Sequence, residues 1–252
     1  MKTFAINLER EKEKRDKIIY ECNRLNIKVN VIKAIDGSKL NELELKKSCP
    51  SYPDNFMTKG VIGCALSHLK IYEEIIKNDI KIALILEDDV VFKIQEVNGI
   101  LDVIEELDCL NSEKPNIYLL SRVHSIIKNN KIKIGDNCLY KVHEAARAHS
   151  YIINNAAARS LHKHLQPIYI EADLWGYFSK LGLANIYSLQ PPITSLIENS
   201  ENLSSLNQER HIIQEKRSKY IHDLLKKNNS YRIKRFFWRV FKKPFLNIEY
   251  TP

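Results

Sequence analysis

The chain has 252 residues, of which 44% are hydrophobic and 28% charged, the composition of a globular protein that buries a substantial core. Its formal net charge of +8 is concentrated in one place. Six basic residues and no acidic residue lie between Ser230 and Lys243, which leaves +2 for the remainder. Nucleic-acid binding by the protein as a whole therefore loses most of its support.

The five cysteines are odd in number and form no C-x-x-C pair, which argues against a disulfide framework or a structural zinc site. A densely charged run begins at position 9, before any apolar stretch of signal-peptide length, and no apolar run approaches the length of a membrane span. We therefore expect a protein that is made and kept in the cytoplasm.

Apolar runs and helical periodicity predict alternating strands and helices in the first half of the chain. The expected elements are strands at 2–8, 28–35 and 80–87 and helices at 9–27 and 60–78, with a loop at 47–59. This alternation predicts an α/β fold, with a mainly parallel sheet flanked by helices.

The second half continues the same pattern. It predicts helices at 95–107, 154–165, 171–182 and 208–227, strands at 116–120, 149–153 and 185–189, and a hairpin at 123–135 that turns at Asn129-Asn130. Asn154 or Asn155 is expected to cap its helix, and the strand at 185–189 is expected to be the last. Residues 193–210 read as polar and irregular.

Three adjacent carboxylates, Glu87, Asp88 and Asp89, follow the strand at 80–87, and we call them the acidic triplet. Carboxylates repel one another, so a partner is implied. A divalent cation such as Mg²⁺ or Mn²⁺ is the natural partner because both prefer oxygen ligands. In an extended chain Glu87 and Asp89 share one side and Asp88 points to the other. The alternative is a solvated acidic turn without a metal.

Several motifs occur in the order found in glycosyltransferase family 25, which comprises bacterial lipopolysaccharide and lipooligosaccharide glycosyltransferases and is related to collagen galactosyltransferases. Each motif is weak alone, but the set in register resembles the family over roughly residues 2–195. The motifs are FAINLEREKEKRD at 4–16, KAIDG at 33–37, KGVIGCALSH at 59–68, ILEDD at 85–89, HSYIINNAAARSL at 149–161 and EADLWGYF at 171–178.

The resemblance implies a GT-A-like, Rossmann-type fold, a nucleotide-sugar donor that is usually UDP-galactose, and Mn²⁺ bound at a D-x-D-type motif. By this analogy Asp89 is the metal ligand, Glu87 contacts the ribose or orients the site, and Asp88 supports the donor sugar. It implies a metal-dependent, inverting hexosyltransferase that extends a lipooligosaccharide or related glycan. UDP-glucose is the alternative donor.

Other residues after the first two strands are candidates for binding the nucleotide. Arginine binds phosphate oxygens in a bidentate manner, which makes Arg10 and Arg15 candidates, although the residues alone favour a solvated helix charge for each. Asn7 ends an apolar strand and is expected to contact uracil or ribose. Asp36 and Gly37 are expected to line the nucleoside pocket.

The GVIGCALSH segment has two interpretations. Gly60 and Gly63 permit close approach of a ligand to the backbone, with Ser67 and His68 one turn later to hydrogen-bond the hexose. Alternatively the glycines serve close helix packing, and His68 is a half-buried structural histidine.

An inverting transfer needs a general base on the face opposite the leaving UDP. Asp173 matches the Asp of the family motif, Glu171 is the reserve, and Trp175 and Tyr177 suit stacking against sugar rings. The alternative for Asp173 is a helix N-cap. We interpret His149 as a strand histidine rather than a third metal ligand. Ser204, Ser205 and His211 lie in a polar segment that could order over the donor, and they are further candidates for site residues.

The C-terminal segment predicts a basic amphipathic helix over 230–243. Its apolar side carries Phe and Ile residues, and such helices lie in the plane of anionic membranes. We therefore divide the chain into a glycosyltransferase domain at 1–210 and a membrane-associating helical segment at 211–252. The expected location is the cytoplasmic face of the inner membrane. The alternative is a terminal helix docked on the core.

Two rival functions remain at this stage. A nucleotidyltransferase or phosphodiesterase also uses carboxylate-held metal, but these enzymes usually need a second carboxylate cluster. A non-enzymatic module that binds membrane or nucleic acid through the tail leaves the acidic triplet without a role.

Overall fold

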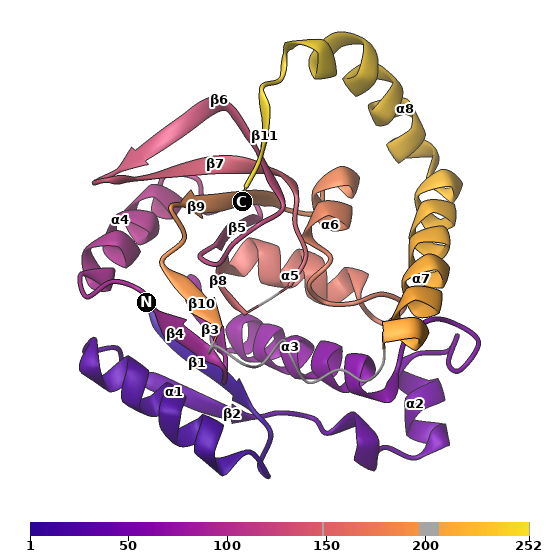
Figure 1. Ribbon diagram of the computed structural model, residues 1–252, viewed down its shortest axis with the longest axis horizontal. Helices are drawn as coiled ribbons and strands as arrows, with labels where there is room; N and C mark the ends of the chain where they lie inside the picture. Colours follow the sequence, from indigo (N-terminus) through magenta and orange to yellow (C-terminus); the bar gives the residue numbers. More distant parts are fainter. Residues whose placement is uncertain (148, 197–206, 252) are drawn as a thin grey trace.

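A nine-stranded sheet forms the centre of the computed structural model, which describes residues 1–147, 149–196 and 207–251 (Figure 1). The strand order is β11-β6-β7-β9-β5-β8-β3-β1-β2. The strands are β1 (Lys2–Asn7), β2 (Val29–Lys33), β3 (Ile82–Glu87), β5 (Asn116–Leu119), β6 (Ser125–Ile134), β7 (Asn137–Glu144), β8 (Ser150–Asn154), β9 (Asn185–Gln190) and β11 (Ile248–Tyr250). A separate two-stranded ribbon pairs β4 (Val90–Phe92) with β10 (Thr194–Leu196).

The sheet is parallel where β2, β1 and β3 lie side by side and again where β5 pairs with β9. Strand β8 runs antiparallel between β3 and β5, and β7, β6 and β11 extend the sheet in antiparallel fashion. Among these nine described strands, six point one way and three the other. The predicted α/β fold is confirmed, and its sheet is mixed because β6 and β7 form a hairpin whereas β1, β2 and β3 are joined by helical crossovers.

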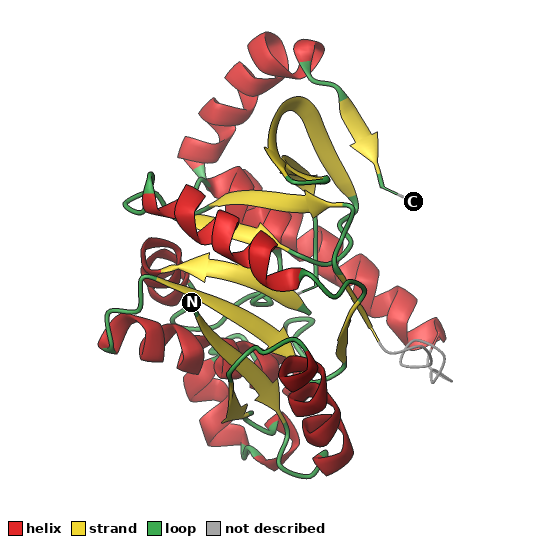
Figure 2. Ribbon diagram, turned by 90° about the vertical axis from the view of Figure 1, so that its left-hand side faces the viewer, coloured by secondary structure: helices red, strands yellow, loops and turns green. Residues whose placement is uncertain are grey.

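Helices cover both faces of the sheet (Figure 2). Strand β3 shows why, since Ala83 and Ile85 join one hydrophobic cluster while Leu84 and Leu86 join the other. The first cluster includes residues of α3 (Lys59–Lys77), α5 (Asn155–His164), α6 (Trp175–Leu181) and α7 (Asn207–Lys227), and the second includes residues of α1 (Lys12–Arg24) and α4 (Val97–Cys109).

Three local predictions were wrong. The hairpin turns at Gly135, which has φ +54°, and Asn129-Asn130 lies inside β6. Glycine adopts this left-handed conformation without strain, so the chain reverses there. At Asn129-Asn130 the chain does not reverse, and β6 only shifts its register with β7 between Ile127 and Ile132. The strand at 185–189 is followed by β10 and β11, and α6 starts only at Trp175.

Two helix ends show how local side chains define the elements. Asn154 caps α5 by accepting a hydrogen bond from the Ala157 amide, as one of the two predicted caps. Helix α2 (Glu42–Ser48) was not predicted, although Asn41 and Glu44 form a capping box at its start.

Gly37 and Gly63 let helix α3 approach the turn that follows β2. A Cβ atom added to Gly63 would lie 2.6 Å from both the Gly37 nitrogen and the Ile35 oxygen. Ser67 reinforces this contact, because its hydroxyl donates to the Gly63 carbonyl at 2.7 Å and accepts from the Ile35 amide at 2.8 Å. The close-packing interpretation of this glycine segment is therefore the one that the structure favours.

We expect Gly63→Ala to lower the free energy of unfolding by about 1–3 kcal/mol, because the new methyl group meets backbone atoms that have no room to move. Urea unfolding monitored by circular dichroism measures this change. Gly99→Ala in α4 is the matched control, since nothing lies within 4 Å of the added Cβ atom. Equal stability of the two variants would contradict this interpretation of the contact.

Candidate functional site

The acidic triplet lies at the edge of the sheet where the carboxyl ends of β1, β2 and β3 meet. The strands are parallel and in register, so Ile6 is paired with Glu87 and Asn7 with Lys33. The side-chain amide of Asn7 donates to Asp88 at 2.7 Å and to the carbonyl of Glu11 at 3.0 Å. Ligands gather at this edge in α/β sheets.

Glu87 is the centre of the cluster. Its Oε2 lies 2.9 Å from His149 Nδ1, and its Oε1 lies 3.9 Å from His68 Nε2. Burial alone would raise the pKa of Glu87, but the hydrogen bond with His149 and the nearby imidazole of His68 lower it to about 2. The carboxylate is therefore ionised throughout the physiological range.

Asp88 and Asp89 point to different partners, as predicted, although they lie in a turn between β3 and β4 rather than in an extended chain. Asp88 accepts from Asn7 and lies 4.0 Å from Lys14 Nζ, whereas Asp89 faces Glu87 and His149. Burial raises the pKa of both aspartates, and the charge of Glu87 raises that of Asp89 further. Asp89 thus carries a charge that its described neighbours compensate poorly.

The ligand atoms of Glu87, Asp89 and His149 all lie within 4.8 Å of one another. Two of their atoms, Asp89 Oδ1 and His149 Nε2, are buried without a hydrogen-bond partner among the described residues. Glu87 meanwhile holds the other ring nitrogen of His149, an arrangement typical of metal-binding histidines. The interpretation of His149 as a strand histidine was wrong, because it precedes β8 and faces the acidic triplet.

Asp173 lies in the segment that leads into α6, and the charge of Glu87 in the cluster affects its pKa. Burial raises the pKa of Asp173, and the carboxylates of Glu171 and Glu87 raise it further, while His68 acts in the opposite direction. The N-cap alternative was wrong, since Leu174 occupies that position and no side chain caps the helix.

Trp175 and Tyr177 are buried, so the expectation that they stack against sugar rings was wrong. The Trp175 indole donates to the Arg147 carbonyl at 2.8 Å and packs on Tyr151 with ring centroids 4.9 Å apart. Their packing instead fixes the backbone that carries Asp173.

His68 and Ser67 are buried, which corrects their expected contact with the hexose. His68 Nδ1 lies 2.8 Å from the Tyr151 hydroxyl, which in turn lies 3.0 Å from the Tyr72 hydroxyl. Burial alone would lower the pKa of His68, but Cys64 and Glu87 raise it to about 10. A cationic His68 beneath Glu87 provides part of the charge compensation that the acidic triplet needs. Ser67 is occupied by backbone contacts, and Gly37 and Gly63 serve packing.

The arginines predicted to bind the nucleotide differ from one another. Arg10 forms an ion pair with Asp36, which links the ends of β1 and β2. A hydrogen bond from Ser38 is the main cause that lowers the pKa of Asp36. Arg15 is exposed on α1 and forms no ion pair within the described residues, which agrees with the solvated-charge alternative. Lys14, not predicted, is the α1 side chain nearest Asp88 among the described contacts.

The remaining candidates are the reserve base Glu171 and the polar residues Ser204, Ser205 and His211. Glu171, the reserve base, forms an ion pair with Arg217 of α7, which makes it less available than Asp173 to accept a proton. Ser204, Ser205 and the side chain of His211 lie outside the described residues.

Comparison with known proteins identifies the family. A family model described as Glycosyltransferase family 25 (LPS biosynthesis protein) matches residues 1–175. Procollagen galactosyltransferase 2 of Mus musculus is 33% identical over 124 residues, which are 46% of this chain and 20% of that protein. A protein named Inactive glycosyltransferase 25 family member 3, also of Mus musculus, is 35% identical over 98 residues, covering 36% of this chain and 17% of its own length.

A solved structure of mouse xyloside xylosyltransferase 1 in its apo form matches with a TM-score of 0.34 and 17% identity, covering 65% of this chain and 57% of that one. A likeness at this level assigns no function to the chain. The chain also spans only about a fifth of the length of the curated relatives it matches. The family match is different, since it covers more than half of the chain and includes the acidic triplet. This chain belongs to glycosyltransferase family 25.

Proposed function

We propose that this protein is a metal-dependent, inverting hexosyltransferase that transfers galactose from UDP-galactose to an oligosaccharide acceptor of the lipooligosaccharide or lipopolysaccharide type. The observation that carries the proposal is the cluster of Glu87, Asp89 and His149, with two buried atoms unpartnered among the described residues, at the ligand-binding edge of the sheet. Family membership and galactosyltransferase relatives support the reaction class and the sugar. UDP-glucose is the alternative donor.

The residues present fit a divalent cation. Asp89 Oδ1 and His149 Nε2 are the atoms that would hold it, and Glu87 would orient His149. Mn²⁺ or Mg²⁺ bound there would neutralise negative charge on the pyrophosphate as the glycosidic bond breaks. Asn7 and Lys14 hold Asp88 in place, which fits its proposed role in supporting the donor sugar.

Asp173 is the proposed general base that accepts the proton of the acceptor hydroxyl. Its raised pKa makes the carboxylate a stronger base than an ordinary exposed aspartate. Arg10 and Asp36, joined by their ion pair, would border the nucleoside at the ends of β1 and β2. Arg10 is half exposed, so its guanidinium is accessible to a phosphate.

UDP should raise the melting temperature of the protein in the presence of Mn²⁺ and much less in the presence of EDTA, because the nucleotide and the cation bind at one site. Hydrolysis of UDP-galactose compared with UDP-glucose then identifies the donor. No stabilisation by UDP with either metal would contradict the proposal and would group this chain with the relatives named inactive. Stabilisation by DNA or RNA without metal would instead favour a nucleic-acid-binding module.

A further inference from the structure

The segment 229–245 forms an arch at one end of the molecule, and we refer to it as the arch (Figures 1 and 2). It comprises α8 (Asn229–Phe237), a π-helical turn (Trp238–Lys242) and a short 3₁₀ turn (Lys243–Phe245). Its inner side is attached to the body through buried Tyr231 and through Trp238, which stacks on His143. At its far end β11 joins the main sheet by pairing with β6.

The other side of the arch is apolar and exposed. Ile233, Phe236, Phe237 and Val240 are spaced three, four and seven residues apart and therefore share one helix face. Between 48% and 62% of each of these side chains is exposed, as is 62% of Phe241 and 75% of Phe245. The docked-helix alternative is therefore wrong for these side chains, since the body covers only the opposite face.

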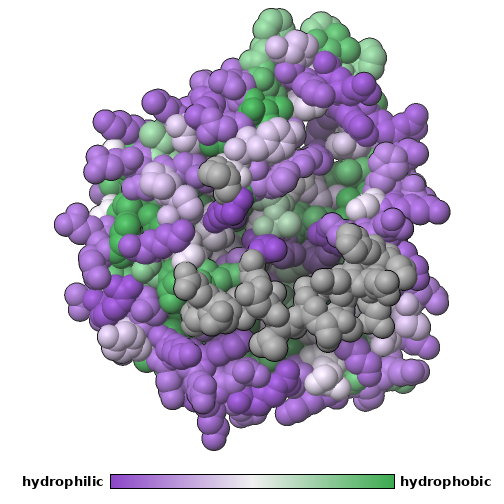
Figure 3. Space-filling model, in the orientation of Figure 1, coloured by the Kyte–Doolittle hydropathy of each residue, from purple (hydrophilic) through white to green (hydrophobic). Residues whose placement is uncertain are grey.

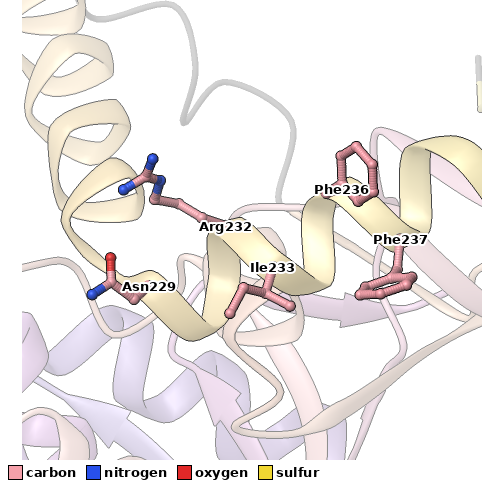
Figure 4. A pocket seen from close by; sticks show the side chains of 5 residues that line it. All are labelled: Asn229, Arg232, Ile233, Phe236 and Phe237. Atoms are coloured by element: carbon pink, nitrogen blue, oxygen red, sulfur yellow. The ribbon is translucent and has the colours of Figure 1, made fainter.

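This apolar face borders an open hollow of about 620 Å³. All five side chains that line the hollow come from α8, as Figure 4 shows, so no other described element closes it. Figure 3 shows hydrophobic surface at the same end of the molecule, surrounded by hydrophilic side chains. Exposed aromatic groups gathered in this way mark an interaction surface.

The charged residues of the arch are all basic. Between Leu224 and Ile248 the chain has eight basic residues and no acidic one. None of the eight forms an ion pair with the described part of the chain, and the six that lie in the arch are exposed. A surface with exposed Phe side chains and unpaired cations around them complements a layer that is negatively charged outside and apolar beneath.

We propose that the arch docks on the surface of a lipid bilayer that carries anionic headgroups, with its Phe side chains inserted and its basic residues among the phosphates. This proposal goes beyond the proposed transferase activity and does not depend on it. Attachment is in the plane of the interface, because the helix axis presents one apolar face along its length. Among the described residues no helix combines the length and the apolarity needed to cross a bilayer. Nucleic acid would use the basic residues but would leave the aliphatic and Phe side chains in water.

Flotation of the full chain with vesicles tests this proposal. We expect the protein to bind vesicles of phosphatidylcholine with phosphatidylglycerol much more tightly than vesicles of phosphatidylcholine alone, and to lose binding as salt is raised. Phe236→Ser with Phe241→Ser should weaken binding at least about tenfold. Arg232→Gln with Arg239→Gln should weaken it roughly fivefold per residue on anionic vesicles.

Matched controls use side chains with similar exposure elsewhere. Tyr20→Ser with Leu110→Ser removes exposed apolar groups, and Lys46→Gln with Lys47→Gln removes exposed charges, and both should leave binding unchanged. Binding that the Phe variant leaves unchanged, or that is equal without anionic lipid, would overturn the proposal. Concentration-dependent dimerisation that the Phe variant abolishes, without vesicle binding, would assign the face to a second copy and also overturn it. Hydrolysis of UDP-galactose needs no vesicles, so either proposal can fail alone.

Discussion

Asp173→Asn is expected to lower the rate of sugar transfer on the order of a thousandfold while leaving UDP binding intact. The substitution keeps the size of the side chain but removes the proposed proton acceptor. Transfer rates measured with saturating donor, together with the UDP-induced shift in melting temperature, separate loss of chemistry from loss of binding. Near-normal turnover would exclude Asp173 as the base.

The stability of Asp173→Asn provides an independent check, because we expect stability to rise while activity falls. Burial and two neighbouring carboxylates raise the pKa of Asp173 in the folded state, so its charge destabilises the fold at any pH above that folded value. Asp173→Asn should therefore raise the melting temperature at neutral pH, and the difference from the parent should shrink as the pH falls through the raised pKa. A variant that is both less active and less stable would point to a structural role instead.

Asp89→Asn is expected to weaken Mn²⁺ affinity by at least about a hundredfold and to remove the metal-dependent stabilisation by UDP. Asp89 supplies an unpartnered buried oxygen and one of the negative charges at the proposed cation site. Titration calorimetry with Mn²⁺ measures the affinity directly. The protein without metal should become more stable at neutral pH, because burial and Glu87 raise the pKa of Asp89.

Asp102→Asn is the control for Asp89, since Asp102 is exposed on α4 and lies outside the cluster. It should bind Mn²⁺ like the parent protein. If Asp89→Asn and Asp102→Asn bind the metal equally, the cation does not lie at the acidic triplet.

Local patterns were sufficient for the elements around the site. The apolar runs at 2–8 and 80–87 predicted the strands β1 and β3, and the sequence placed the acidic triplet directly at the end of β3. The motif set likewise identified the family before any geometry was considered, because sequence identity in register needs no coordinates. The tail also revealed its apolar and basic sides through helical spacing alone.

The tertiary structure decided which side chains share the site. His149 lies 62 residues from Glu87 along the chain, and no spacing rule relates a residue before β8 to the end of β3. Their contact exists because β8 inserts antiparallel next to β3. The pairing of Lys14 with Asp88 depends in the same way on how α1 packs beside β1.

Burial reversed several functional expectations for the same reason. Ser67, Trp175 and Tyr177 have side chains suited to binding sugars, yet packing against distant segments encloses them. The sequence by itself determined the α/β class, the acidic triplet and the basic tail, since these depend on the order of residues over short stretches of chain. Long-range packing determined solvent access and the sharing of charge between groups, because both depend on which segments the sheet order brings together.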